Sequence, residues 1–378
     1  MEKGMPLLQK CTAYTEAVLN DLKTLVEIET PTGYAEGILA EQKVLRTWFE
    51  QLGAIVEIRP FDGGANLMAS LKGTGTKKLM LLAHADTVFK RGTLAHNPYR
   101  IENGKVYGPG CIDCKGGIVL GLYALKLLKG QGYTDYGTIT FLVNGDEETG
   151  SDASRDLIVE LAGKHDAVLV LEASKKNHGA CLARGGLGQA TVTVHGVTCH
   201  ACRYEQGANA LEEMAHQILQ LRTLSDKEAQ SSVSCTVCRS GEVANAIPDT
   251  AVCQVDIRYK TQQEYDRIVT AARNFAEHPL VPGTKVEFFI KAHPAFPENP
   301  ATKAMADKLK AIYAEIGESM EPVTSPGISD ANYIYPTGTP VIDGLSFAGF
   351  NSHSDQEEGD AASIPSHLYG LTRFLQEL

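Results

Sequence analysis

The hydrophobic pattern along the chain predicts an α/β core. Apolar residues recur at helical spacing over residues 15–29 and 38–52, and each segment ends at a glycine or at Pro-Thr-Gly. Continuous apolar runs of strand length then alternate with helical segments, with strands at 79–83, 138–144 and 167–172 and helices at 116–130 and 154–164. Strands that are apolar along their whole length are buried on both faces. We therefore predict an open, mainly parallel sheet with helices on both faces.

The pattern changes at about residue 187. Residues 188–196 and 250–259 alternate apolar and polar side chains, which is typical of half-buried antiparallel strands. Together with the strands and helices predicted around them, they give the order strand, helix, strand, strand, helix, strand of a ferredoxin-like domain. After residue 293 the helix and strand pattern of the first region resumes. We therefore predict that 1–186 and 294–378 are two parts of one α/β domain, with an α+β domain inserted at 187–293.

Composition and charge exclude several classes of partner. The 378 residues carry a formal net charge of -11 and contain no block of Lys and Arg, which argues against a nucleic-acid partner. The sequence has no run of 18 apolar residues and no apolar leader with a small-residue cleavage site. We expect a cytoplasmic protein without a membrane partner. Its nine cysteines, an odd number, are then free thiols and not a disulfide framework.

Acids and histidines follow three of the predicted buried strands. The first strand is followed by a histidine and an aspartate, the second by two glutamates, and the third ends in a glutamate; these residues are His84, Asp86, Glu147, Glu148 and Glu172. The carboxyl ends of parallel strands meet at one edge of the sheet, where ligands bind in open α/β folds. Asp113, just before the helix at 116–130, lies near the same edge.

Each of these acids taken alone is more often a helix cap or a solvated loop residue. Several carboxylates and an imidazole at one edge, however, would repel one another unless a cation neutralised them. Carboxylate and imidazole ligands suit Zn²⁺ or a similar divalent ion. A metal centre is therefore the simplest explanation of the set.

Three Cys-x-x-Cys pairs offer an alternative chemistry. In GCIDCKGG, residues 110–117, either the two thiols or the aspartate between them is functional. Cys235 and Cys238 lie in a predicted strand, where residues three apart point to opposite faces and do not share a metal unless the strand bends. The third pair, Cys199 and Cys202, flanks a histidine in the segment GVTCHACR.

Eight ordered segments resemble dinuclear zinc exopeptidases and deacylases of the glutamate carboxypeptidase, aminoacylase and succinyl-diaminopimelate desuccinylase type. The segments are AHADTV, GPGCIDCKGG, NGDEETGS, VLVLEAS, HGVTCHA, NAIPDTAVCQVDIRY, PGISDANY and GFNSHSD. They cover nearly the whole chain and are most similar to the glutamate carboxypeptidase (carboxypeptidase G) branch. The resemblance implies a zinc exopeptidase core and a lid or dimerisation domain at 187–293.

The resemblance also implies a role for each residue of the edge. Two Zn²⁺ ions, for which Co²⁺ or Mn²⁺ could substitute, are expected with Asp113 as the bridging carboxylate. The remaining ligands are His84 and Glu172 on one ion and Glu148 and His353 on the other. Glu147 matches the general base, and Asp86 resembles the acid that orients the imidazole of His84.

The resemblance assigns the function of GCIDCKGG to Asp113. Cys111 and Cys114 are then small neighbours that pack behind the aspartate. In relatives the peptide bond after this aspartate is cis although no proline follows it. We therefore predict a cis bond between Asp113 and Cys114.

The second domain is expected to contribute to substrate binding. His200, in the GxxxHA motif, resembles the histidine that reaches a partner subunit's site to stabilise the oxyanion, so a homodimer is expected. Asn245 and Arg258 match residues that hold the terminal carboxylate of the substrate, and a guanidinium donates bidentately to a carboxylate.

The predicted function is metal-dependent hydrolysis of a peptide or amide bond next to a C-terminal amino acid. Relatives that release such an amino acid, or that remove an acyl group, tend to have Glu at the position of Glu172. An aminoacylase or deacetylase acting on N-acyl amino acids is therefore the alternative. A non-catalytic binding protein on the same fold is disfavoured because every expected ligand and the base are present.

Overall fold

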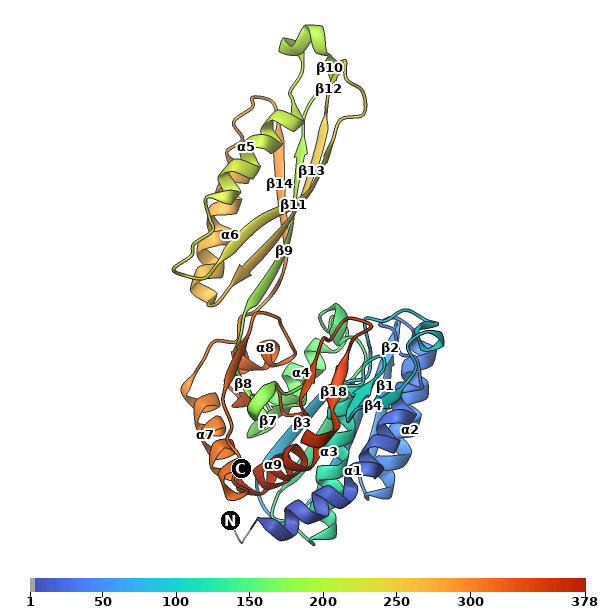
Figure 1. The fold of residues 1–378 in the computed structure, drawn as a ribbon. Coiled ribbons are helices and arrows are strands. Elements are labelled where there is room, and N and C mark those ends of the chain that lie inside the picture. The colour runs from blue at the N-terminus through green and yellow to red at the C-terminus, as the bar shows by residue number, and fades with distance from the viewer. Residues whose placement is uncertain (1–3) are drawn as a thin grey trace. The chain divides into compact units, whose positions relative to one another are not determined.

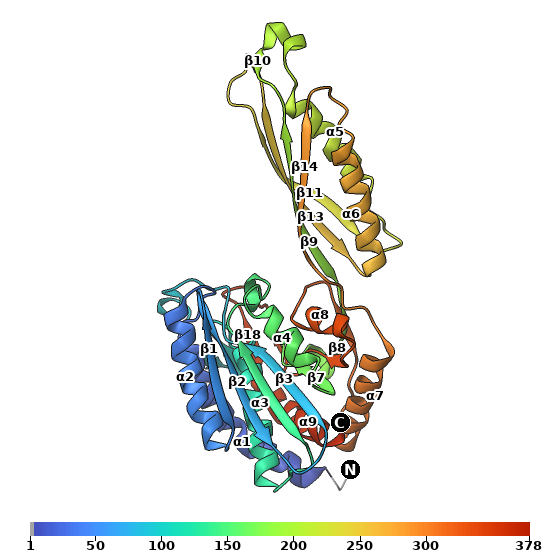
Figure 2. The same cartoon turned by 180° about the vertical axis from the view of Figure 1, so that it is seen from behind.

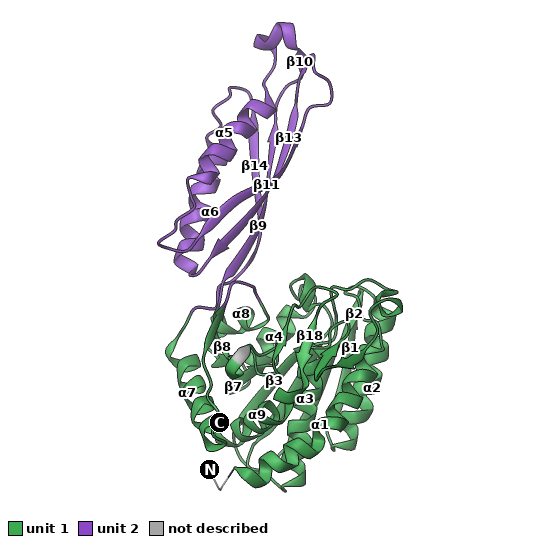
Figure 3. Cartoon of the chain, in the orientation of Figure 1, with its two compact units in different colours: residues 1–183, 298–324, 329–378 green, residues 184–297, 325–328 purple. Residues whose placement is uncertain are grey.

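The computed structural model describes residues 4–378, which form two compact units (Figure 3). Unit 1 holds the described residues up to Ala183 together with Glu298–Thr324 and Ser329–Leu378. Unit 2 holds Arg184–Pro297 and Ser325–Ile328. The segment 187–293, predicted as an insertion, lies within unit 2.

Unit 1 is built on a six-stranded sheet with the order β1-β2-β6-β3-β7-β16. In that order the strands are Ile55–Phe61, Gly64–Lys72, Thr138–Asn144, Lys78–His84, Ala167–Val170 and Val341–Ile342. β3 pairs in parallel with β6 and β7, and β16 pairs in parallel with β7. β1 and β2 are antiparallel additions at one edge. The prediction of a mainly parallel open sheet is confirmed.

Helices cover both faces of this sheet (Figures 1 and 2). They are α1 (Met5–Val26), α2 (Ala35–Gln51), α3 (Lys115–Gly130), α4 (Arg155–Ala162), α7 (Pro300–Glu315), α8 (Ala331–Ile334) and α9 (Ile364–Glu377). Buried residues of α1, α2, α3, α7 and α9 form one hydrophobic cluster with Leu79 and Leu81 of β3 and Phe141 of β6. Thr140 points to the other face, where His165 after α4 contacts its hydroxyl at 2.9 Å.

Short elements complete unit 1. β17 (Gly349–Phe350), β18 (Glu358–Asp360), β5 (Lys105–Tyr107) and β4 (Arg100–Glu102) form a small sheet in that order, and β15 (Val323–Ser325) pairs with β8 (Cys181–Arg184). The 3₁₀ helices are η1 (Thr93–Ala95), η2 (Glu147–Thr149), η3 (Lys176–His178), η5 (Tyr335–Thr337) and η6 (Ala361–Ser363). The small sheet positions the segment around His353, which joins β17 to β18.

Unit 2 has the predicted ferredoxin-like order. β9 (Gly186–His195), α5 (Ala210–Arg222), β11 (Ser232–Ser240), β13 (Thr250–Tyr259), α6 (Gln262–Glu277) and β14 (Lys285–His293) follow one another along the chain. The four strands form an antiparallel sheet in the order β11-β13-β9-β14, and the helices cover one of its faces. β10 (Cys199–His200) pairs with β12 (Ala246–Ile247), and η4 (Ala201–Gln206) follows β10.

One expectation about β11 is wrong. Cys235 pairs with Val255 and Cys238 pairs with Cys253, with a shift of register between Cys235 and Val237. Because Val255 and Cys253 are two residues apart on β13, they point to the same face, and so do their partners. A β-bulge adds one residue to β11 and restores the phase between the two cysteines. Cys235 and Cys238 therefore share one face of the sheet.

Within residues 4–378, no helix has both the length and the apolar character that crossing a membrane requires.

Candidate metal centre

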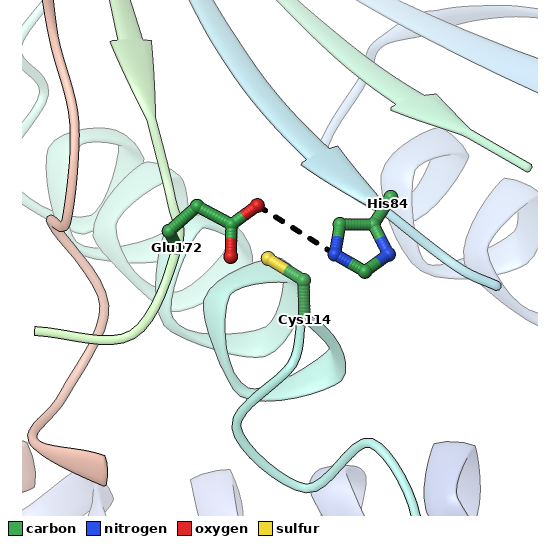
Figure 4. Close-up of side chains that lie close together, drawn as sticks. All are labelled: His84, Cys114 and Glu172. Atoms are coloured by element: carbon green, nitrogen blue, oxygen red, sulfur yellow. Dashed lines mark ion pairs between the residues drawn. The ribbon is translucent and has the colours of Figure 1, made fainter. Parts of the chain in front are cut away.

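Three strands of unit 1 place side chains at one edge of the sheet. β3 ends at His84, whose ring is only 1% exposed. Its Nε2 atom lies 3.6 Å from Glu172 Oε1, beyond the end of β7, and 4.0 Å from Glu147 Oε2, in η2 after β6. Figure 4 shows the carboxylate of Glu172 facing the imidazole of His84. The strand ends thus bring together the residues that the sequence placed there.

Asp113 lies between two imidazoles. Its Oδ1 atom is 3.1 Å from His84 Nε2, and its Oδ2 atom is 3.2 Å from His353 Nε2. His353 Nε2 is also 3.1 Å from Glu148 Oε2. His353 has a φ of 65°, in the left-handed region, and its side chain is exposed. The five residues expected as ligands therefore form one cluster with Asp113 at its centre, although they come from segments as far apart as 84 and 353.

The donor set fits divalent cations. Ligand atoms of His84, Asp113 and Glu148 all lie within 4.8 Å of one another, as do those of His84, Cys114 and Glu172. Carboxylates and imidazoles packed this closely are the ligands that zinc takes in proteins. Asp113 offers one oxygen to each side of the cluster, as a bridging ligand would.

The carboxylates and imidazoles of the cluster shift one another's pKa values. Hydrogen bonds to Asp113 and Glu148 raise the pKa of His353 to about 10. Burial lowers the pKa of His84, but hydrogen bonds to Asp113 and Asp86 outweigh it and raise the pKa well above its usual value. Burial also raises the pKa of Glu147 well above its usual value. Carboxylates this close together favour positive charge in the site, which divalent ions would supply.

Asp86 connects the imidazole to the turn that carries the two glutamates. The backbone N–H groups of Glu147 and Glu148 donate to its carboxylate at 3.0 and 3.1 Å, and the Thr32 hydroxyl donates at 2.7 Å. His84 Nδ1 lies 3.0 Å from the backbone oxygen of Asp86 and 3.4 Å from Oδ1. Asp86, fully buried, therefore fixes the position of η2 as well as that of the ring.

The two cysteines beside Asp113 are buried thiols. The peptide bond between Asp113 and Cys114 is cis, which confirms the prediction. Cys111 and Cys114 are 0% exposed, and burial raises the pKa of both well above the usual value. Cys114 Sγ lies beside His84 and Glu172 (Figure 4) and donates to the Leu171 carbonyl at 3.1 Å. Cys114 therefore lies directly beside two of the candidate metal ligands, whereas the sequence predicted only that it packs behind Asp113.

Sequence reasoning missed Glu357. Its carboxylate accepts from the backbone N–H groups of Ile112 at 2.9 Å, Gly110 at 3.2 Å and Asp113 at 3.3 Å. Burial and the nearby charge of Asp113 raise the pKa of Glu357 to about 8, against the effect of these hydrogen bonds. Glu357 therefore holds the loop that carries Asp113. Its only sequence signal is its place four residues after His353.

The second missed feature is a buried ion pair behind the same loop. Lys115 Nζ donates to Glu41 Oε2 at 2.7 Å and to the carbonyls of Leu25 and Ile28 at 2.8 Å. The two side chains are 1% and 0% exposed. This pair ties the start of α3, two residues after Asp113, to α1 and α2. In the sequence, Lys115 and Glu41 look like ordinary helix-surface residues.

The three candidate residues of unit 2 fall at two places within that unit. His200 pairs with Ala246 across β10 and β12, and Ala201 N–H donates to the Asn245 carbonyl at 2.9 Å. Arg258 lies near the far end of β13, where its guanidinium donates to both oxygens of Asp256 at 2.9 and 3.0 Å. At about 3.3 Å per residue, the length of β13 separates Arg258 from the other two by about 25 Å. The structure thus brings His200 and Asn245 together, but not Arg258.

Comparisons with known proteins agree with this geometry. A family model described as peptidase family M20/M25/M40 matches residues 80–377. The chain is 38% identical to carboxypeptidase G2 of Pseudomonas sp. (strain RS-16), over 98% of this chain and 92% of that protein. It is 32% identical to acetylornithine deacetylase of Proteus mirabilis, over 49% of this chain and 48% of that protein. The fold is similar to the crystal structure of aminopeptidase PepT from Bacillus cereus, with a TM-score of 0.80, 20% identity and coverage of 96% and 98%.

Replacing Lys115 by Met is expected to destabilise unit 1 by about 3 to 5 kcal/mol, because the carboxylate of Glu41 stays buried without its partner. Urea denaturation of the purified variant measures the change. Lys164→Met, which removes the exposed ion pair with Glu160, is the matched control and should cost less than about 1 kcal/mol. Equal effects of the two substitutions would show that the buried pair has no special role.

Glu357→Gln is expected to weaken divalent-metal binding by about 10- to 100-fold, since the amide has one acceptor oxygen for three backbone N–H groups. Competition with a chromogenic chelator measures the affinity. Glu358→Gln is the control, because that carboxylate accepts from the Tyr107 hydroxyl and not from the loop. Unchanged zinc affinity in Glu357→Gln would show that the hydrogen bonds of Glu357 to the Asp113 loop do not contribute to metal binding.

Proposed function

The chain belongs to peptidase family M20/M25/M40, and on that basis we propose that it releases a C-terminal amino acid from a small peptide or amide. Its family makes it a metal-dependent hydrolase. The observation that carries the proposal is the cluster in which two imidazoles and the carboxylates of Glu148 and Glu172 lie around Asp113. The 38% identity to carboxypeptidase G2 over nearly the whole chain favours a carboxypeptidase.

We propose two zinc ions as the native metal, with cobalt or manganese able to replace them. His84 and Glu172 would hold one ion, Glu148 and His353 the other, and Asp113 both. When bound, the ions supply positive charge that polarises the scissile carbonyl and acidifies a water molecule.

Glu147 is proposed as the general base. Its carboxylate lies at the edge of the cluster, and the N–H that it donates to Asp86 fixes the start of η2. A carboxylate there takes a proton from the attacking water and gives it to the departing amine. Burial raises the pKa of Glu147, which helps the carboxyl group to hold that proton between the two steps.

Unit 2 is proposed to bind the substrate. The guanidinium of Arg258 suits a terminal carboxylate, which would replace Asp256 as its bidentate partner. That exchange costs little because the existing pair is exposed. Because Asn245 lies beside His200 and far from Arg258 within one unit, both would come from a partner subunit: Asn245 would hold the same end of the substrate, and His200 would donate to the oxyanion. This arrangement requires a homodimer.

The nine cysteines are free, which supports a reducing compartment, and we propose that the protein is cytoplasmic.

Removal of an acyl group from an N-acyl amino acid is the second candidate. The 32% identity to acetylornithine deacetylase, which covers 49% of the chain, is the observation that favours it. Both reactions break an amide bond whose nitrogen belongs to an amino acid, so the same base and metal ligands serve either one. The two functions differ in the group on the carbonyl side of the bond.

Glu147→Gln is expected to lower kcat by about 10²- to 10⁴-fold while metal content stays at the wild-type level, because the amide cannot accept the proton. Steady-state kinetics and elemental analysis of the same preparation measure both quantities. Glu160→Gln, an exposed change on α4, should leave both unchanged. Near-normal turnover in Glu147→Gln would remove Glu147 from the mechanism.

Chelation followed by addition of zinc, cobalt or manganese is expected to abolish and then restore hydrolysis. The assay should compare N-blocked dipeptides with N-acetyl amino acids bearing the same leaving residue. A higher kcat/KM for the dipeptides supports the carboxypeptidase, and a higher value for the acetyl compounds supports the deacylase. Hydrolysis that survives complete metal removal would contradict the metal-dependent function itself.

A further inference from the structure

Three cysteines form a cluster in unit 2 that the proposed function does not use. Cys238 lies directly opposite Cys253 in the antiparallel pair of β11 and β13, and Cys235 lies opposite Val255 on the same face. The β-bulge between Cys235 and Val237 is what turns both cysteines of β11 toward Cys253. The cluster is therefore a product of the strand register and not of local sequence spacing.

The three thiols run from the core of unit 2 to its surface. Cys253 is 0% exposed and belongs to the hydrophobic cluster, Cys235 is half-buried, and Cys238 is exposed. Cys253 Sγ donates to the Gln254 carbonyl at 3.6 Å, and the strand register places Cys253 directly across from Cys238 and two residues from the partner of Cys235. A reagent in solvent therefore reaches Cys238, whose direct neighbour in the sheet is a buried thiol.

The spacing favours a pairwise reaction over a metal site. A metal site needs at least three ligand atoms close together. Among residues 4–378, sets of three such atoms within 4.8 Å of one another occur only around His84, and the three cysteines do not form one. Directly opposed residues of an antiparallel pair, by contrast, have Cα atoms about 4.5 or 5.5 Å apart. Both separations fall within the range of about 4.4 to 6.8 Å that a disulfide spans.

We propose that Cys238 and Cys253 form a reversible disulfide when the protein meets a hydroperoxide. The O–O bond of the peroxide breaks as the sulfur of Cys238 becomes a sulfenic acid, and water or an alcohol leaves. The sulfur of Cys253 then forms the S–S bond as the S–O bond breaks, and the proton of Cys253 leaves with the hydroxyl as water. Two thiols are oxidised by two electrons and one peroxide is reduced.

Cys235 is the neighbouring group that assists the second step. Its hydrogen bond with Cys253 lowers the pKa of Cys235 and raises the pKa of Cys253. Cys235 thus lies against Cys253 and helps to hold that sulfur on the face of the sheet that Cys238 shares. It is a positioning residue for the bridge and not one of its ends.

The bridge would close the segment 239–252. This segment holds β12 and Asn245, and β12 pairs with the strand that ends in His200. A covalent link between Cys238 and Cys253, at the two ends of this segment, would restrict its motions. The modification itself does not depend on the proposed function, since the bond forms within unit 2 from residues outside the metal centre.

The test treats the reduced, full-length protein with hydrogen peroxide and maps the disulfides by mass spectrometry of peptides. The expected result is a protein two hydrogens lighter, with a link between the peptides of Cys238 and Cys253, and full reversal by a thiol reductant. Slower amide hydrogen exchange in 239–252 should accompany it. A sulfinic or sulfonic acid at Cys238 without a link, or a link only between Cys199 and Cys202, would overturn the proposal.

Cys238→Ser is the decisive variant, because position 238 is exposed and the substitution leaves the core intact. It should abolish the link, whereas Cys202→Ser, at the other exposed cysteine of unit 2, should leave the link unchanged. Cys235→Ala should slow formation of the link without preventing it. A peroxide-induced link between Cys235 and Cys253 in Cys238→Ser protein, at the wild-type rate, would show that the pairing is wrong.

Discussion

Repulsion among buried carboxylates is the constraint on which unit 1 depends. Asp113, Glu148 and Glu172 lie around His84 at a sheet edge where little solvent reaches them. Low dielectric makes their mutual repulsion large, so the arrangement needs compensating positive charge. Divalent cations provide it, and the same cations provide the chemistry. The carboxylates that need cations for their stability are therefore the same groups that hold the cations for hydrolysis.

Such a site needs a rigid frame, because cations bind tightly only where the ligands are already in place. The carboxylate of Glu357 holds the loop of Asp113 from one side, and the ion pair of Lys115 and Glu41 holds the start of α3 from the other. Asp86 fixes the turn of Glu147 and Glu148. Each of these groups is itself buried and hydrogen-bonded, so its position is set by several contacts at once.

Unit 2 follows a different principle. Its sheet places the cysteines by register, and one extra residue in β11 decides which thiols meet. His200 and Asn245 lie beyond one end of this sheet, and Arg258 lies near the other end. Because His200 and Asn245 are far from Arg258, the proposed substrate site needs a partner subunit. Because the register brings Cys238 and Cys253 together, the proposed disulfide can form.

Local pattern alone determined the elements and much of the site. Uninterrupted apolar runs marked β3, β6 and β7, and because parallel strands share one edge, their last residues indicated His84, Glu147, Glu148 and Glu172. Periodicity could not place His353 or Glu357 beside Asp113, since 240 and 244 residues separate them from it in the chain. Nor could it reveal the pairing of Lys115 with Glu41 or the bulge in β11. Those contacts depend on how distant segments pack and pair, which only the tertiary structure decides.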